Sequence, residues 1–173
     1  MMLRRLALAS VLLIASSAAP AMAATATTNL GTTATVVANC TISTTPVAFG
    51  SYDPVTTNAG TALTGTGTVT TTCTDGSVAS ITLDQGSNPA TGSTDAAPAR
   101  QLIDGSTNTL LYSLYSDTGR TVVWGNTSGA GGTDVTVTGS GVAQASTVYG
   151  SIAGAQNKPA GAYTDTVQAT VTF

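Results

Sequence analysis

The side chains that most often carry enzymatic chemistry are scarce in this chain. It contains no histidine, and its eight acidic residues are all aspartates. Without histidine there is neither a Ser-His-Asp nor a Cys-His arrangement, so acid–base work would fall to aspartates and tyrosines. No P-loop, G-x-S-x-G or Gly-rich turn leading into a helix is present. The sequence therefore predicts a protein that is not an enzyme, with no catalytic residues, no metal site and no cofactor.

The aspartates occupy positions that are typical of turns. Asp75, Asp104, Asp117 and Asp134 each adjoin turn glycines or threonines, where a carboxylate accepts hydrogen bonds from nearby backbone N–H groups. No loop has the alternating ligand spacing of a calcium-binding loop. We interpret these carboxylates as turn residues.

Three aromatic residues raise the possibility of a sugar-binding platform. Tyr112 and Tyr115 are three residues apart, so on a strand their rings point to opposite faces. Because aromatic rings bury a large area, core packing of Trp124 and one of the tyrosines is the better interpretation.

The two cysteines, Cys40 and Cys73, predict a structural disulfide in an exported protein. They do not form a C-x-x-C pair, and zinc would lack histidine ligands. A bond between them closes a loop of about 34 residues, which is worth about 3.8 kcal/mol in the chain-entropy picture.

Residues 1–23 have the features of a signal peptide. Arg4 and Arg5 precede the apolar run Leu6–Ala15, and Ala21-Met22-Ala23 provides a small-residue cleavage pattern. Cleavage after Ala23 predicts export to the periplasm, with no membrane insertion of the mature chain. The mature chain keeps three basic residues against eight aspartates, a net charge of −5, which disfavours nucleic-acid binding.

The rest of the chain predicts β-structure that would hold these residues in place. It is rich in Thr, Val and Gly, and several windows alternate with period two. Short strands separated by turn signals favour a single sandwich or barrel domain, residues 39–173. The internal runs are Gly65–Thr74, Val78–Asp84, Thr109–Tyr115, Thr121–Trp124, Asp134–Thr138 and Val142–Ile152.

Both ends of the mature chain also alternate. At the C-terminus, one face of a predicted strand carries Val167, Ala169, Val171 and Phe173, and the chain ends on that strand. At the N-terminus, residues 24–38 place small and apolar side chains on one parity, namely Thr28, Leu30, Thr32, Ala34 and Val36. Only Leu30 and Val36 of this set are sizeable.

Four stretches, in order along nearly the whole mature chain, resemble the spore coat protein U domain family, which includes subunits of Csu-type archaic chaperone–usher pili. They are Asn39-Cys40-Thr41-Ile42 with Val47-Ala48-Phe49-Gly50-Ser51-Tyr52-Asp53; Gly67–Cys73; Leu111–Asp117 with Arg120 and Val123-Trp124-Gly125; and Val148-Tyr149-Gly150, Pro159–Asp165 and Val171-Thr172-Phe173. Each stretch is weak alone, whereas their order and spacing together are specific.

The resemblance implies an all-β fold, an incomplete immunoglobulin-like β-sandwich completed by donor-strand exchange. In such systems a periplasmic chaperone lends the missing strand, an outer-membrane usher exports the subunit, and the N-terminal extension of a neighbouring subunit then fills the gap. A chain that ends within a strand leaves an unpaired edge, which is a template for another strand. Residues 24–38 are the expected donor, and the strand Val167–Phe173 is the expected acceptor edge.

The expected function is a structural pilus subunit that supports adhesion and biofilm formation at the cell surface. Two alternatives remain open. One is a coat protein of a spore or other resting cell, and the other is a carbohydrate-binding tip adhesin. Neighbouring chaperone and usher genes would favour the pilus.

Overall fold

The computed structural model describes residues 21–173, which belong to two units. Residues 21–35 of the first unit contain no helix and no strand, and their side chains are exposed. Residues 1–20 of the expected signal peptide lie outside the described residues. The second unit, Val36–Phe173, holds all the strands.

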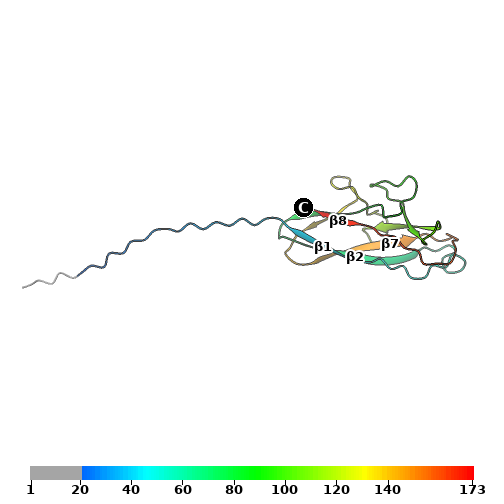
Figure 1. The fold of residues 1–173 in the computed structure, drawn as a ribbon, viewed down its shortest axis with the longest axis horizontal. Helices are drawn as coiled ribbons and strands as arrows, with labels where there is room; N and C mark the ends of the chain where they lie inside the picture. The colour runs from blue at the N-terminus through cyan, green and yellow to red at the C-terminus, as the bar shows by residue number, and fades with distance from the viewer. Residues whose placement is uncertain (1–20) are drawn as a thin grey trace, which may run out of the picture. The chain divides into compact units, whose positions relative to one another are not determined.

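The second unit is all-β, as the sequence predicts: every regular element within residues 21–173 is a strand (Figure 1). The eight strands are β1 (Cys40–Thr45), β2 (Leu63–Cys73), β3 (Val78–Leu83), β4 (Arg100–Ile103), β5 (Thr109–Tyr115), β6 (Val135–Thr138), β7 (Gln144–Ile152) and β8 (Ala169–Thr172).

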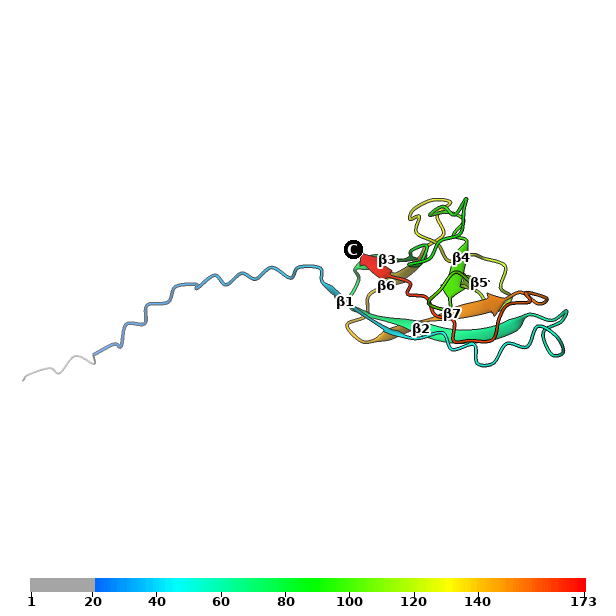
Figure 2. The same ribbon diagram turned by 45° about the vertical axis from the view of Figure 1, so that its right-hand side comes forward.

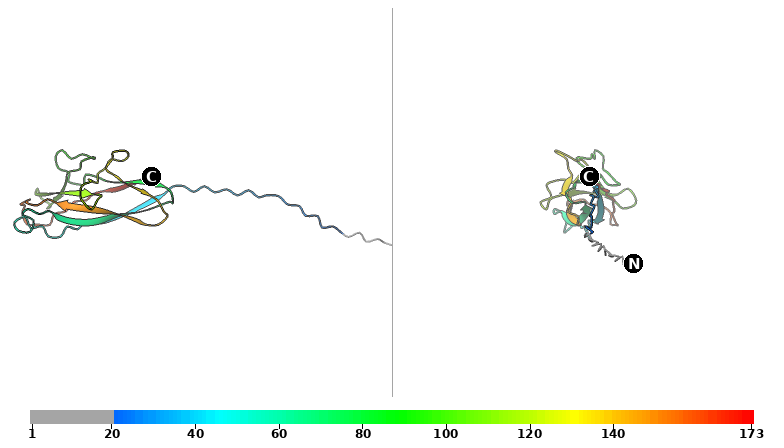
Figure 3. Two further views of the ribbon diagram at one scale, coloured as in Figure 1. Left: turned by 180° about the vertical axis from the view of Figure 1, so that it is seen from behind. Right: turned by 90° about the vertical axis from the view of Figure 1, so that its left-hand side faces the viewer.

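The strands form two antiparallel sheets that pack face to face (Figures 2 and 3). One sheet has the order β1-β2-β7-β5-β4, and the other has the order β6-β3-β8. Four strands are therefore at sheet edges, and two of these, β1 and β8, lie beside each other on opposite sheets. The strands β1 and β8 run in opposite directions, and Phe173 lies near the start of β1 (Figures 1 and 2).

The alternating sequence accounts for the two faces of each sheet. Along β2, Val69, Thr71 and Cys73 are buried while the intervening threonines are more accessible. The core between the sheets consists of Val69, Ile81, Leu83, Leu110, Tyr112, Leu114, Trp124, Val148 and Ile152. Trp124 has 0% exposure, and its indole N–H donates to the Ile81 carbonyl at 2.9 Å. The prediction of core packing for Trp124 and one tyrosine, Tyr112, is confirmed.

A disulfide joins β1 to β2. Cys40 and Cys73 are directly opposite in the β1–β2 register, with their Cα atoms 4.1 Å apart. This short separation is typical of a non-hydrogen-bonded antiparallel pair. The disulfide therefore links the first strand of the domain to its neighbour at one end of the sheet.

Two local predictions differ from the structure. Thr121–Trp124 is not a strand, since only the isolated bridge between Val123 and Tyr115 forms there. The carboxylate of Asp117 accepts hydrogen bonds from the backbone of Thr121 and Val122, which curls this segment into a turn. The strands β1 and β4 were not among the internal runs expected from the sequence.

Across residues 21–173, no helix has the length and apolar character needed to cross a membrane.

Candidate functional site: a groove between two open strand edges

The backbone of β8 is open along one side. Asp84 N donates to Gln168 O on the β8 side of β3, whereas Leu83 N donates to Gly125 O on the other side. Alternate residues of a strand turn their backbone groups to opposite sides, so Ala169, opposite Leu83, directs its N–H and C=O away from β3. Val167 and Val171 share this parity. Since β8 is the last strand of its sheet, this edge has no strand partner among the described residues.

The facing edge of β1 is open in the same way. Thr74 N donates to Asn39 O, which marks the Asn39–Thr74 pair as hydrogen-bonded, and the Cys40–Cys73 pair that follows is not. By alternation, Cys40, Ile42 and Thr44 direct their backbone groups away from β2. Two unpaired edges therefore border the same gap between the sheets.

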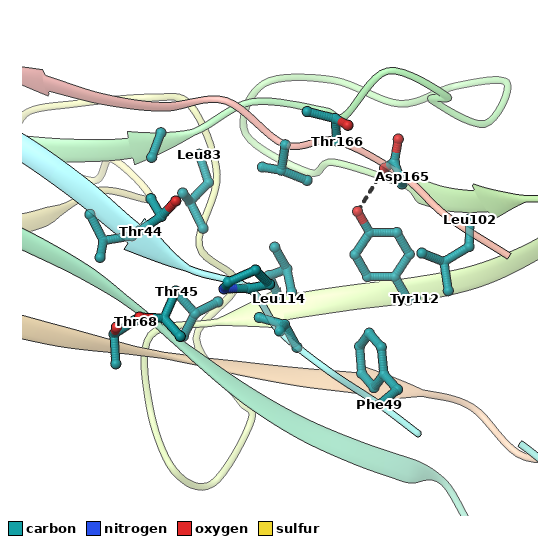
Figure 4. A pocket seen from close by; sticks show the side chains of 16 residues that line it. Thr44, Thr45, Phe49, Thr68, Leu83, Leu102, Tyr112, Leu114, Asp165 and Thr166 are labelled. Atoms are coloured by element: carbon teal, nitrogen blue, oxygen red, sulfur yellow. Dashed lines mark hydrogen bonds between the residues drawn. The ribbon is translucent and has the colours of Figure 1, made fainter. Parts of the chain in front are cut away.

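A cavity of about 340 Å³ lies between these edges and opens into the core (Figure 4). Its walls come from Thr44–Val47 with Phe49 on one side and from Asp165–Val167 with Ala169 on the other. Its floor consists of the core residues Val69, Leu83, Leu114 and Val148. We call this cavity and its open edges the groove. An apolar floor flanked by unpaired backbone groups has the features that bind an extended strand.

Glycines in β2 and β7 give the β1 side of the groove its position. A Cβ at Gly67 would lie 2.6 Å from Thr45 O, and one at Gly150 would lie 2.6 Å from the Phe49 ring. Without side chains there, the segment after β1 packs flat on the sheet. Phe49 then meets Tyr112 edge-on, with ring centroids 6.0 Å apart, and the two rings border one end of the cavity.

A polar pair interrupts the apolar lining. The Tyr112 hydroxyl donates to Asp165 Oδ2 at 2.7 Å (Figure 4). Burial, and after it this hydrogen bond, raises the pKa of Tyr112 well above its usual value, so the phenol stays protonated and remains a donor. Asp165 Oδ1 also accepts from Ser87 N at 3.0 Å and Asn88 Nδ2 at 3.1 Å. The carboxylate is therefore held in place by three donors.

Arg100 supports this corner from inside the core. The residue is opposite Tyr112 in the β4–β5 register and has 0% exposure. Its Nε donates to Asp84 O at 2.8 Å, and its Nη2 donates to Leu83 O and Trp124 O at 3.0 and 2.9 Å. Burial lowers the pKa of Arg100, while Tyr112, Asp84 and Asp165 oppose that shift. Arg100 ties the five-stranded sheet to the end of β3 beneath Asp165.

A second cavity, of about 820 Å³, continues past Asp165. It shares Val47, Phe49, Leu102 and Asp165 with the first cavity and extends to Leu110, Ile152 and Tyr163. The two cavities therefore adjoin at these four residues, beside the segment that follows β1 and the segment that leads into β8.

Two of the four expected acceptor residues, Val167 and Ala169, line the cavity, whereas Val167 and Phe173 lie just outside β8. The role of these residues as an acceptor edge stays a prediction. Tyr163, Asp165, Val167, Ala169 and Val171 are half-buried, whereas the residues between them are exposed. Phe173 follows this parity but is 53% exposed. The expected donor residues Thr28, Leu30, Thr32, Ala34 and Val36 are not in a strand, and each is exposed. Their role as a donor stays a prediction.

Sequence reasoning missed several residues of the groove. Val47, Phe49 and Asp165 lie within stretches that carry the family resemblance, which was the available signal for them. Arg100 gave no signal, because an isolated arginine is typical of a surface.

Within residues 21–173, no three His, Cys, Asp or Glu side chains cluster to hold a metal ion. The buried Trp124 and Tyr112 are not available as a sugar platform.

Comparison with known proteins identifies relatives of the chain. The family model described as the Spore Coat Protein U domain matches residues 25–170. Protein U of Myxococcus xanthus is 46% identical over 161 residues, which cover 89% of this chain and 88% of that protein.

The fold has a counterpart among solved structures. A chain in the crystal structure of a chaperone–tip adhesion subunit pre-assembly complex, CsuC–CsuE, from the archaic chaperone–usher Csu pili of Acinetobacter baumannii superposes with a TM-score of 0.56. The sequences are 19% identical, and the match covers 80% of this chain but 40% of that chain. This likeness supports an immunoglobulin-like sandwich fold.

Proposed function

Because the chain belongs to the spore coat protein U domain family, we propose that it is a structural subunit of a chaperone–usher pilus that polymerises by donor-strand complementation. The observation that carries the proposal is the groove, in which two unpaired strand edges border an apolar cavity of about 340 Å³. Its apolar floor and the unpaired backbone groups at its edges suit an extended strand. Residues 24–38 of a neighbouring copy are the proposed occupant.

The pattern of the N-terminal segment supports this occupant. Leu30 is 89% exposed and Val36 is 83% exposed, and both have the parity that would face the groove floor. Burying these two side chains in a neighbour would contribute about 3–6 kcal/mol. The main-chain hydrogen bonds to both edges would add about 0.5–1.5 kcal/mol each, and the entropy of association offsets part of the total.

The proposal includes the route to the cell surface. Residues 1–23 act as a signal peptide, a periplasmic chaperone occupies the groove before assembly, and an outer-membrane usher exports the subunit. The assembled fibre supports adhesion and biofilm formation. No chemical reaction is assigned to the chain, and it needs no metal or cofactor.

The family description favours a second candidate, a coat protein of a spore or other resting cell. The same groove and the same donor segment would serve both assemblies. Immunogold labelling of growing and resting cells separates them, because a pilus subunit extends from growing cells and a coat protein surrounds resting cells.

Electron microscopy of cells tests the proposal. Cells that make the full chain should carry fibres that label with an antibody to it, and cells without the gene should lack them. A variant without residues 24–38 should reach the periplasm and form no fibres. If this variant left normal fibres on the surface, the donor-strand proposal would be wrong.

A further inference from the structure

Asp165 is an unusual residue for the lining of a groove that binds an apolar strand. Of the described residues that line the cavity of about 340 Å³, it is the only charged one. Apolar surface lies on either side of it: Val167, Leu83 and Leu114 in the first cavity, and Leu110 and Ile152 in the second. A strand that extends from the first cavity into the second passes this carboxylate, which lines both.

By lone-pair count the Asp165 carboxylate has one acceptor site left, on Oδ2, an oxygen that also packs against the Gly86 backbone. An ionised carboxylate offers about four lone-pair sites, and three are used: Oδ1 accepts from Ser87 and Asn88, while Oδ2 accepts from Tyr112. Because Asp165 is only half-buried, water hydrates it while the groove is empty. A docked strand that removed this water without a donor of its own would leave a buried charge short of a partner, which is costly.

The two ends of the domain along its strands, which we call its poles, set the direction of the docked strand. Residues 36–39 lead into β1 at the pole where Phe173 ends (Figure 2). A docked strand antiparallel to β8 leaves the groove at the opposite pole, so the domain that follows it lies clear of the recipient. The reverse direction would place that domain where the recipient's own N-terminal segment leaves. A linear fibre therefore requires the strand to run antiparallel to β8.

Backbone parity restricts the register. Val167 and Ala169 face the groove with both side chain and backbone, so the residue opposite each must turn its backbone toward β8. The even-numbered residues of the N-terminal segment meet this requirement while pointing their side chains to the floor. Successive inward residues lie about 6.8 Å apart. Choosing which of them faces Asp165 then defines every other contact.

We infer that Thr32 of the neighbouring copy lies opposite Asp165 and donates its hydroxyl hydrogen to the free site on Oδ2, an inference that rests on the proposed function. Leu30 then lies opposite Val167 in the first cavity, and Val36 reaches the second. Moving the segment by two residues places Leu30 or Ala34 over the carboxylate. Moving it by four brings Thr28 there, but Ala26 then underfills the first cavity. Thr32 and Asp165 act together as the register determinant.

Disulfide trapping in assembled fibres tests the register. The inferred pairing puts Thr28 opposite Ala169, in a hydrogen-bonded antiparallel pair whose Cα separation of about 5.5 Å permits a disulfide. Fibres of the Thr28→Cys, Ala169→Cys double variant should form covalent ladders on a non-reducing gel. The matched double variant Ala26→Cys, Ala169→Cys should not. Equal linking of both pairs, or linking by the Ala26→Cys pair alone, would overturn the inference.

A double-mutant cycle on fibre dissociation tests the hydrogen bond. Thr32→Val should speed the loss of subunits in guanidinium about tenfold to hundredfold, the effect expected for a hydrogen bond to a charged group. Thr28→Val, the same change on the neighbouring inward threonine, should alter the rate much less. The Thr32→Val effect should largely vanish in fibres that carry Asp165→Asn. Equal effects of the two threonine variants would overturn the inference.

The two ideas fail in different ways. If the full chain forms no fibres, both the proposed function and the register are wrong. If fibres form but the cysteine pairs link in another register, the inference alone is wrong.

Discussion

The neighbouring strands β3 and β8 have the same kind of alternating sequence but bury their inner side chains to different extents. Ala79, Ile81 and Leu83 of β3 are 0–3% exposed, whereas Ala169 and Val171 of β8 are only half-buried. Among the described residues, β3 lies between β6 and β8, and β8 has a strand partner on one side only. Similar alternation therefore gives unequal burial when one strand has a neighbour on one side only, and the proposed donor strand would be the second neighbour of β8.

Supplying that strand within the same chain should produce the largest effect on stability. Residues 24–38, appended after Phe173 through a flexible linker, should raise the free energy of unfolding by about 3–6 kcal/mol from apolar burial alone. Main-chain hydrogen bonds would add to this gain. Urea unfolding of the two chains measures the difference.

The control is the same fusion with Leu30→Asp in the appended copy, which would bury an unpaired charge. This control should lose most of the gain. A gain that persists in the control would mean that the appended segment does not occupy the groove.

A matched pair of isoleucines sharpens the comparison with a smaller effect. Ile81 on β3 is 0% exposed, and Ile42 on the open edge of β1 is 37% exposed. Ile81→Val should cost about 0.5–1.5 kcal/mol, as is usual in a packed core. In the monomer, Ile42→Val should cost about half of that or less, since part of the side chain already meets water. Equal costs for both variants in the monomer would contradict an open groove.

The smallest expected effect is a loss of stability at low pH that does not depend on the groove. Hydrogen bonds from the Val122 backbone lower the pKa of Asp117, and the Asn108 side chain lowers the pKa of Asp104, both below the usual 3.8. Stability from these turns is present above pH 3.8 and is lost as the pH falls through the lower folded values. Asp117→Asn should flatten part of this dependence in urea titrations between pH 5 and pH 2. Equal flattening is expected in the monomer and the fusion.

Much of the fold could be predicted because the alternation of apolar and polar residues and the positions of turn residues indicate the same strand boundaries. The runs expected at Thr109–Tyr115 and Gly65–Thr74 correspond closely to β5 and β2. The strand β1 escaped prediction because its sequence CTISTT has one large apolar residue, and its position depends on pairing with β2. Arg100, the first residue of β4, would be expected at the surface because arginine is mostly exposed in folded proteins. It lies in the core instead, where it donates hydrogen bonds to three carbonyl groups.

The candidate site was predictable on one side only. The parity of Val167, Ala169 and Val171 predicted which residues of this segment are half-buried, because strand periodicity is local. Their role as an acceptor edge stays a prediction. The opposite wall, Thr44–Val47 with Phe49, and the Tyr112–Asp165 hydrogen bond join segments more than fifty residues apart in the sequence. Strand periodicity is a local pattern and does not predict which distant segments meet. Asp165 looks like another turn aspartate until its partners on β5 and in the loop after β3 are known.

Hydrogen–deuterium exchange of single amides tests the central claim most directly. The comparison is between wild-type fibres and the full-length Leu30→Asp chain, which should remain monomeric because its N-terminal segment cannot dock. The amides of Val167, Ala169 and Val171 should exchange rapidly in the monomer and become protected in the fibre, while the β3 amides stay protected in both. If the amides of Val167, Ala169 and Val171 exchanged equally in monomer and fibre, β8 would not be the edge that a neighbour completes.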